Sequence, residues 1–100
     1  MAKCKITILK TTFNADIAES FCKQGIGACQ IFTEGQEFFI NDPWQKPENF
    51  CSTAWGDIFK NIQTISLGGN FPSAIKPGIN ISCCVDGIRP VIFKIERITD

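Results

Sequence analysis

Six cysteines are the residues of this chain best able to do chemistry. The 100 residues include no histidine and no tyrosine, which removes the commonest general base, the commonest nitrogen ligand of metals and a phenolic acid. Chemistry therefore falls to cysteine, aspartate, glutamate, lysine and arginine. Among these, a thiolate can act as a nucleophile, as a redox centre or as a ligand of soft metals.

Cys51 has the sequence surroundings of an activated thiolate. Helical spacing predicts a long helix from Phe50 to about Leu67, which places Cys51 in its first turn. There the unpaired backbone amides and the positive end of the helix dipole stabilise negative charge on a sulfur. The alternative is that Cys51 is simply the first core-facing residue of the helix.

Cys29 and Cys84 are the predicted partners of Cys51. Cys29 follows a glycine-rich loop, residues 24–28, where no regular element demands an apolar side chain. Cys84 stands beside a polar turn, on the face of a predicted strand that points away from the core. We therefore expect a thiol-dependent function in which Cys51 is the catalytic thiolate.

A metal site is a second use of the same three thiols. Zinc and iron–sulfur signatures carry paired cysteines at Cys-x-x-Cys spacing, and this sequence has no such pair. Thiolates from Cys29, Cys51 and Cys84 would nevertheless leave an open fourth position on a soft metal or an iron–sulfur centre. The expected function is thus redox chemistry or soft-metal binding, with the cofactor and the ligand left open.

The other three cysteines are predicted to be structural. Cys4, Cys22 and Cys83 fall on apolar faces of predicted elements, and free cysteine is among the most buried residue types. A disulfide between Cys83 and Cys84 is disfavoured, because adjacent side chains of a strand point to opposite faces. The apolar run Ile6–Leu9 is far too short for the core of a signal peptide, so we expect reduced thiols in a cytoplasmic protein.

Three further residues are candidates for ligand binding. Asp86 and Arg89 lie near Cys84 and are able to hold a carboxylate or a phosphate, although a turn explains both. Trp55, together with Phe59, can line a small-molecule pocket with Cys51 at its mouth. The favoured alternative is that both rings fill the core.

The pattern of polar and apolar residues predicts the elements that position these side chains. Alternation predicts four strands, at residues 3–8, 36–40, 79–85 and 89–98. A short helix is predicted from Asn14 to about Lys23, with Ile17 and Phe21 in an apolar stripe that faces inward. The expected fold is a single α+β domain, residues 1–100, with two layers: a mainly antiparallel sheet of about four strands, and one short and one long helix packed on one face.

The last two strands are predicted to form a hairpin around Asp86-Gly87. We expect a three-residue loop, because that register unites Ile81 and Cys83 with Val91 on one apolar face. In this register Cys83 points into the core.

Charge and hydropathy limit the partners of the chain. Ten basic and ten acidic residues cancel, which argues against nucleic acid, and no apolar run approaches the length of a membrane span. The alternative to thiol chemistry is a non-catalytic binding or assembly module that works as a homo-oligomer. Its contact surface would be an exposed apolar patch of Phe39, Trp44 and Phe71.

Three motifs resemble a known family. They are Gly27-Ala28-Cys29, the segment from Phe50 to Trp55, and the ending from Cys83 to Arg97. Together they resemble a family of small conserved-cysteine proteins of about this length, found mainly in anaerobic bacteria and archaea. The resemblance implies reduced thiols in an anaerobe's cytoplasm, with Cys29, Cys51, Cys83 and Cys84 as the motif cysteines. It implies no substrate, cofactor or reaction.

Overall fold

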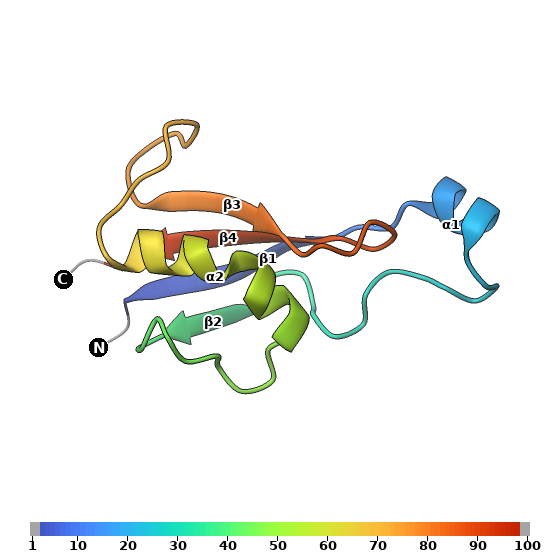
Figure 1. The fold of residues 1–100 in the computed structure, drawn as a ribbon, viewed down its shortest axis with the longest axis horizontal. Helices are drawn as coiled ribbons and strands as arrows, with labels where there is room; N and C mark the ends of the chain where they lie inside the picture. The colour runs from blue at the N-terminus through green and yellow to red at the C-terminus, as the bar shows by residue number, and fades with distance from the viewer. Residues whose placement is uncertain (1–2, 99–100) are drawn as a thin grey trace.

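The computed structural model describes residues 3–98 (Figure 1). Its elements, in chain order, are β1 (Cys4–Thr11), α1 (Ala15–Phe21), β2 (Glu37–Ile40), α2 (Ser52–Ser66), β3 (Ile79–Cys83) and β4 (Val91–Arg97). The four strands form one antiparallel sheet in the order β2-β1-β4-β3. The predicted α+β class with a four-stranded antiparallel sheet is therefore confirmed. Within residues 3–98, neither helix combines the length and the apolar character that a membrane crossing needs.

Strand β1 lies in the middle of the sheet because it is paired on both edges, with β2 and with β4. Its side chains alternate as the sequence predicted: Cys4, Ile6 and Ile8 are buried on the inner face. The register places Ile6 between Phe38 and Ile95, so three neighbouring strands contribute apolar side chains to one inner surface.

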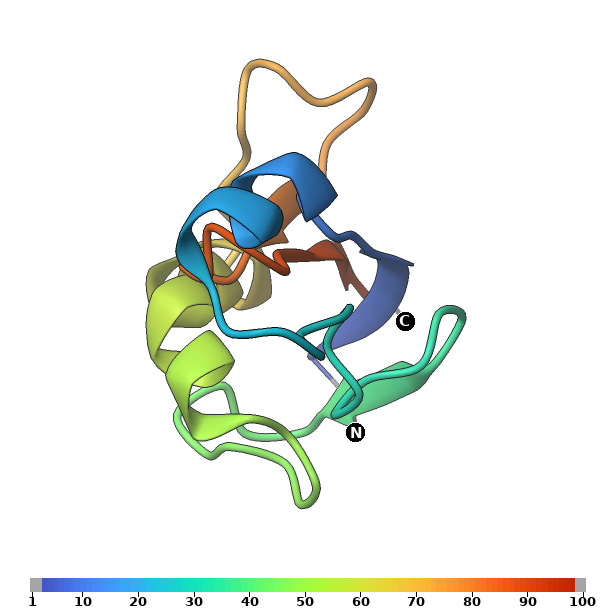
Figure 2. The same ribbon diagram turned by 90° about the vertical axis from the view of Figure 1, so that its right-hand side faces the viewer.

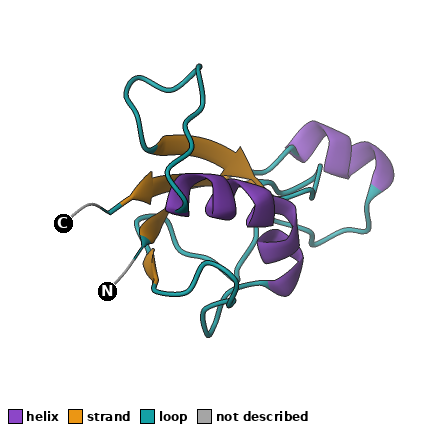
Figure 3. Cartoon of the chain, turned by 60° about the vertical axis from the view of Figure 1, so that its left-hand side comes forward, coloured by secondary structure: helices purple, strands orange, loops and turns teal. Residues whose placement is uncertain are grey.

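Helix α2 covers that inner surface (Figure 3). Ile58, Ile62 and Ile65 follow one another at steps of four and three residues, so they form one stripe, and all three are fully buried. Beside the stripe, the rings of Phe32, Phe50 and their neighbours meet edge to face or tilted, a favourable arrangement for aromatic pairs.

The end of α2 is fixed by backbone and side-chain hydrogen bonds. Gly68 has a φ of 99°, and the Gly69 N–H donates to the Thr64 carbonyl at 2.7 Å, which is the pattern of a Schellman motif. Arg97 of β4 donates from Nη1 to the carbonyls of Ile65 and Gly69, at 3.0 and 2.8 Å. The guanidinium therefore ties the last turn of the helix to the sheet.

Helix α1 stands apart from the sheet, beyond the end of the β1–β4 ladder (Figures 1 and 2). The radius of gyration is 14.4 Å, compared with about 13 Å for a compact domain of 100 residues. Within the described chain, α2 contacts β1, β3 and β4, whereas α1 contacts neither α2 nor any strand, so the predicted packing of both helices on one face is not confirmed.

The inward stripe predicted for α1 is wrong in part. Phe21 is 85% exposed and Ile17 is 43% exposed, whereas Ala18 is buried. The physical reason is that the extended residues 11–14 carry the helix past the sheet, so no core surface is left for its stripe to cover. In the described structure, the only hydrogen bond between residues 15–31 and the rest of the chain is the one to Asn14.

The predicted register of the β3–β4 hairpin is also wrong. Ser82 pairs with Phe93 and Cys83 pairs with Ile92, so Cys83 is exposed on the open face of the sheet. The inner side of β3 is polar, and Ser82 on that side accepts a hydrogen bond from Asn61 of α2 at 2.7 Å. The connection is accordingly longer than three residues, and the apolar pattern of β3 marks the outer face of an edge strand.

The bonds of Arg97 to the end of α2 give a first prediction. We expect Arg97→Met to lower the free energy of unfolding by about 1.5–3 kcal/mol, because helix carbonyls lose a charged donor. The control Lys94→Met removes an ion pair to Glu96 on the open face and should cost about 1 kcal/mol or less. Urea unfolding measures both, and equal losses would contradict the proposed role of Arg97.

Candidate functional site

A cavity of about 500 Å³ lies where three segments of the chain meet: the loop 25–32, the start of α2, and residues 84–91, which are the β3–β4 connection and the first residue of β4. Cys29, Cys51 and Cys84 all line it, one from each segment. The three thiols also pack against the hydrophobic core and are half-buried. Residues far apart in the sequence thus present sulfur to the same space.

Loop 25–32 reaches the cavity because its far end is anchored in the core. Phe32 is buried and its ring lies 5.0 Å from that of Phe50 and 5.4 Å from that of Phe93, measured between centroids. At the other end, Gly25 has a φ of 90°, a conformation that favours glycine. Cys29 lies between these two points on the cavity wall.

Cys51 occupies the N-cap position of α2, one residue before the helix begins. Its carbonyl accepts the hydrogen bond of the Trp55 N–H at 2.9 Å, but its side chain makes no capping hydrogen bond. The first turn of α2 contains no acidic residue. The positive end of the helix dipole therefore faces the region of the Cys51 sulfur without a carboxylate of the first turn to neutralise it.

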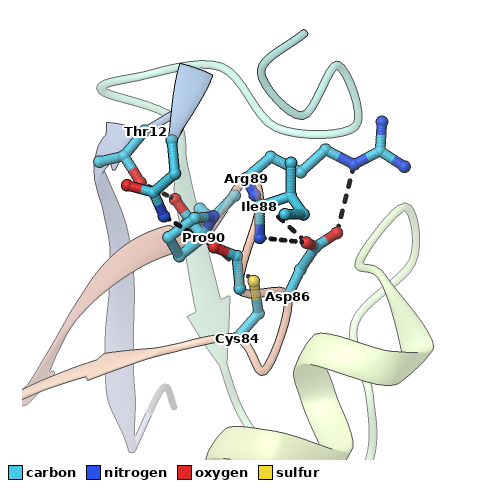
Figure 4. Close-up of polar contacts among 9 residues, drawn as sticks. Thr12, Cys84, Asp86, Ile88, Arg89 and Pro90 are labelled. Carbon is cyan, nitrogen blue, oxygen red and sulfur yellow. Dashed lines mark hydrogen bonds and ion pairs between the residues drawn. The ribbon is translucent and has the colours of Figure 1, made fainter. Parts of the chain in front are cut away.

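Cys84 lies at the neck of the β3–β4 connection (Figure 4). Its N–H donates to the Val91 carbonyl at 3.2 Å, and its Sγ accepts the Val91 N–H at 3.3 Å. The sequence prediction placed Cys84 away from the core; in the structure its side chain lies on the α2 side, because the hairpin register differs.

The connection between β3 and β4 is organised by Asp86. Its Oδ1 accepts the N–H groups of Ile88 and Arg89, at 2.9 and 3.2 Å, and its Oδ2 accepts Arg89 Nε at 3.2 Å. The Ile88 amide is the main cause that lowers the pKa of the Asp86 carboxyl below its ordinary value of 3.8; partial desolvation opposes the shift, and Arg89 adds to it. Both Asp86 and Arg89 line the cavity.

Residues that sequence reasoning did not select hold this connection from outside. Thr12 donates from Oγ1 to the Pro90 carbonyl at 2.6 Å. Asn14 is the N-cap residue of α1, but its side chain makes no capping hydrogen bond and donates from Nδ2 to the Gly87 carbonyl at 2.7 Å. Asp57 of α2 accepts the Val85 N–H at 2.8 Å. No sequence motif predicts these contacts, because each joins residues that are 28 or more positions apart.

Trp55 does not line the cavity, although it was a candidate binding residue. It is buried in the core, and its ring lies 5.9 Å from Phe50 and 5.8 Å from Phe59, between centroids. Its placement agrees with the alternative that the sequence favoured, in which Trp55 and Phe59 fill the core.

The three cysteines predicted to be structural have three different environments. Cys4 is fully buried, and this burial raises the pKa of its thiol, although a hydrogen bond with Ser66 opposes the shift. Cys22 is half-buried just after α1. Cys83 is exposed, so the prediction that it packs in the core is wrong. All six cysteines lie in the described part of the chain and are free thiols.

The cavity thiols do not form a ready-made metal site. Among residues 3–98, no three or more side chains of the metal-ligating types are grouped closely enough to hold an ion. Cys29, Cys51 and Cys84 share a cavity, but they would have to move together before one ion could bind all three.

The three aromatic residues of the predicted apolar patch do not share a surface. Phe39 pairs with Lys5 on the open face of the sheet, where the Lys5 ammonium lies 6.0 Å from its ring centroid. Trp44 lies against Phe59 of α2, and Phe71 packs against the core. Phe39 and Trp44 are therefore on opposite sides of the sheet.

No protein family, no curated protein and no solved structure matches this chain. The resemblance to small conserved-cysteine proteins accordingly rests on the sequence motifs quoted above.

The lowered pKa of Asp86 gives a prediction about pH. A carboxyl with a depressed folded-state pKa stabilises the fold above its unfolded pKa, and that stabilisation disappears as pH falls through the folded value. We expect parent and Asp86→Asn to differ in free energy of unfolding near neutral pH and to converge below pH 3.8. Urea unfolding across pH measures this, and a difference that persists at low pH would contradict the assignment.

The environments of Cys4 and Cys83 predict opposite reactivity. Iodoacetamide should modify the exposed Cys83 in the native protein, whereas Cys4 should react only after unfolding, because burial excludes the reagent and its raised pKa keeps the thiol protonated. Peptide mass mapping, before and after addition of urea, distinguishes the two. Rapid native labelling of Cys4 would show that the sheet opens readily at its N-terminal strand.

Proposed function

We propose that this is a thiol-dependent protein whose chemistry takes place in the cavity between loop 25–32, the start of α2 and residues 84–91. The observation that carries the proposal is that Cys29, Cys51 and Cys84 line one cavity although they come from three distant segments. Cys4, Cys22 and Cys83 do not line this cavity.

The proposed reaction is thiol–disulfide exchange. Cys51 is the attacking thiolate, because the start of α2 favours negative charge on its sulfur. Cys84, whose sulfur accepts the Val91 N–H, and Cys29, on the loop, are the partners that can form a disulfide with it. The cavity volume of about 500 Å³ suits a small molecule as the exchange partner.

Soft-metal binding is the second use of the same site. It would employ the same three thiolates, with an ion that draws them together from the cavity wall. Because the described residues lack a preformed ligand group, this alternative requires the three thiols to move together.

A non-catalytic oligomeric module is the alternative outside thiol chemistry. It is supported by the exposure of Phe21 and of Ile75, which is 95% exposed, and no longer by the patch predicted from the sequence. Light scattering of the parent and of the Cys29→Ser, Cys51→Ser and Cys84→Ser variants tests it. An oligomer that persists in all three variants would favour this alternative.

The thiol proposal predicts a specific disulfide pattern. In a Cys83→Ser background, which removes the exposed thiol, mild oxidation by the neutral bis(2-hydroxyethyl) disulfide should link Cys51 to Cys29 or Cys84. We expect Cys51→Ser to slow thiol loss by about tenfold or more, because the favoured nucleophile is gone. The matched control Cys22→Ser, at a half-buried thiol outside the cavity, should oxidise like the parent.

Mass mapping of the linked peptides tests thiol–disulfide exchange. Elemental analysis of anaerobically purified protein tests soft-metal binding. Equal oxidation rates for Cys51→Ser and Cys22→Ser would contradict the exchange reaction. Stoichiometric metal that is lost in Cys51→Ser would instead identify soft-metal binding.

A further inference from the structure

Of the residues 3–98, Arg89 is the only one with a cationic side chain on the wall of the cavity that Cys29, Cys51 and Cys84 line. Its Nε donates to Asp86 Oδ2 at 3.2 Å, and this bond orients the guanidinium. In the described structure Nη1 and Nη2 have no hydrogen-bond partner, and Figure 4 shows both nitrogens extending past Asp86. Arg89 therefore lines the cavity with two donors that no residue of the described chain uses, and its side chain is 43% exposed, so a ligand can reach it.

Among the described residues that line the cavity, Asp86 is the only acidic one. Its two oxygens already accept two backbone N–H groups and Arg89 Nε, and these bonds favour its charged form. The Asp86 carboxylate is thus occupied by hydrogen bonds within the protein, while Nη1 and Nη2 of Arg89 remain free to bind a ligand. Two parallel N–H donors match the two oxygens of a carboxylate.

The rest of the wall fits the body of a small organic acid. Ile26, Ile31 and Phe32 offer apolar contact, and Thr53 at the start of α2 adds a hydroxyl. The start of α2 also favours a negatively charged ligand over a positively charged one. Sulfur, apolar surface and a carboxylate-binding group therefore line the same space.

We propose that the exchange partner is a small disulfide, or the thiol derived from it, that carries a carboxylate recognised by Arg89. This inference rests on the proposed thiol function. In the reaction, the Cys51 thiolate attacks one ligand sulfur; the Cys51 Sγ–S bond forms as the ligand S–S bond breaks. The departing half leaves as a thiolate and takes a proton from water. The ligand is reduced and Cys51 is oxidised to a mixed disulfide.

A matched set of symmetric disulfides tests the inference: 3,3′-dithiodipropionate is anionic, bis(2-hydroxyethyl) disulfide is neutral and cystamine is cationic. The readout is the rate at which intact-mass spectrometry detects the mixed disulfide at neutral pH and low salt, in the Cys83→Ser background. We expect the anionic probe to react about tenfold faster than the neutral one, and the cationic probe to be slowest.

The ratio of the rate with the anionic probe to the rate with the neutral probe measures the contribution of Arg89. It should fall to about one in Arg89→Met and stay high in the control Lys94→Met, which removes a cation from the open face of the sheet. Because loss of the Arg89–Asp86 pair also loosens the connection, two further measurements are needed. Arg89→Lys should give an intermediate ratio, and raised salt should lower the ratio in the parent.

The outcomes separate this inference from the one on which it rests. Failure of the neutral disulfide to react at Cys51 would overturn the thiol function itself. Reaction at Cys51 with a ratio near one, with a ratio that survives Arg89→Met, or with a ratio insensitive to salt would overturn only carboxylate recognition.

Discussion

The packing of α2 against the central strands β1 and β4 is the contact on which the rest of the structure depends. Ile58, Ile62 and Ile65 are fully buried, and so is Phe93 of β4. When this stripe packs against the sheet, the positions of both ends of α2 follow. The C-terminal end is hydrogen-bonded to Arg97 of β4, and the N-terminal end places Cys51 at the cavity. The apolar contact thus decides where the reactive end of the helix lies, and the hydrogen bonds at its other end prevent it from sliding.

The cavity itself depends on polar contacts between distant parts of the chain. Thr12 and Asn14, which follow β1, hold the carbonyls of the β3–β4 connection, and Asp57 of α2 holds its first amide. Asp86 then folds the connection onto itself. Since side-chain bonds with exposed partners are individually worth about 1 kcal/mol, the connection is less firmly fixed than the sheet below it. The position of the connection beside Cys51 is therefore set by contacts between residues far apart in the sequence.

The elements could be predicted from the sequence wherever one face meets the core. Cys4, Ile6 and Ile8 alternate because one side of β1 is buried, and α2 shows a helical stripe for the same reason. The hairpin register could not be predicted, because Ile81 on an open edge strand has the same apolar pattern as a core residue. The exposure of Phe21 had no sequence signal either, since periodicity defines a stripe without saying whether anything covers it.

The segment from residue 15 to residue 31 is attached to the body of the protein at two points. Asn14 holds one end to the Gly87 carbonyl, and Phe32 holds the other in the core. Between them, within the described chain, no hydrogen bond ties the segment to the sheet. Cys29, in the middle of the segment, is placed by packing against the core and not by a hydrogen bond. Because the segment belongs to no strand of the sheet, a ligand that displaced it would leave every strand pairing in place.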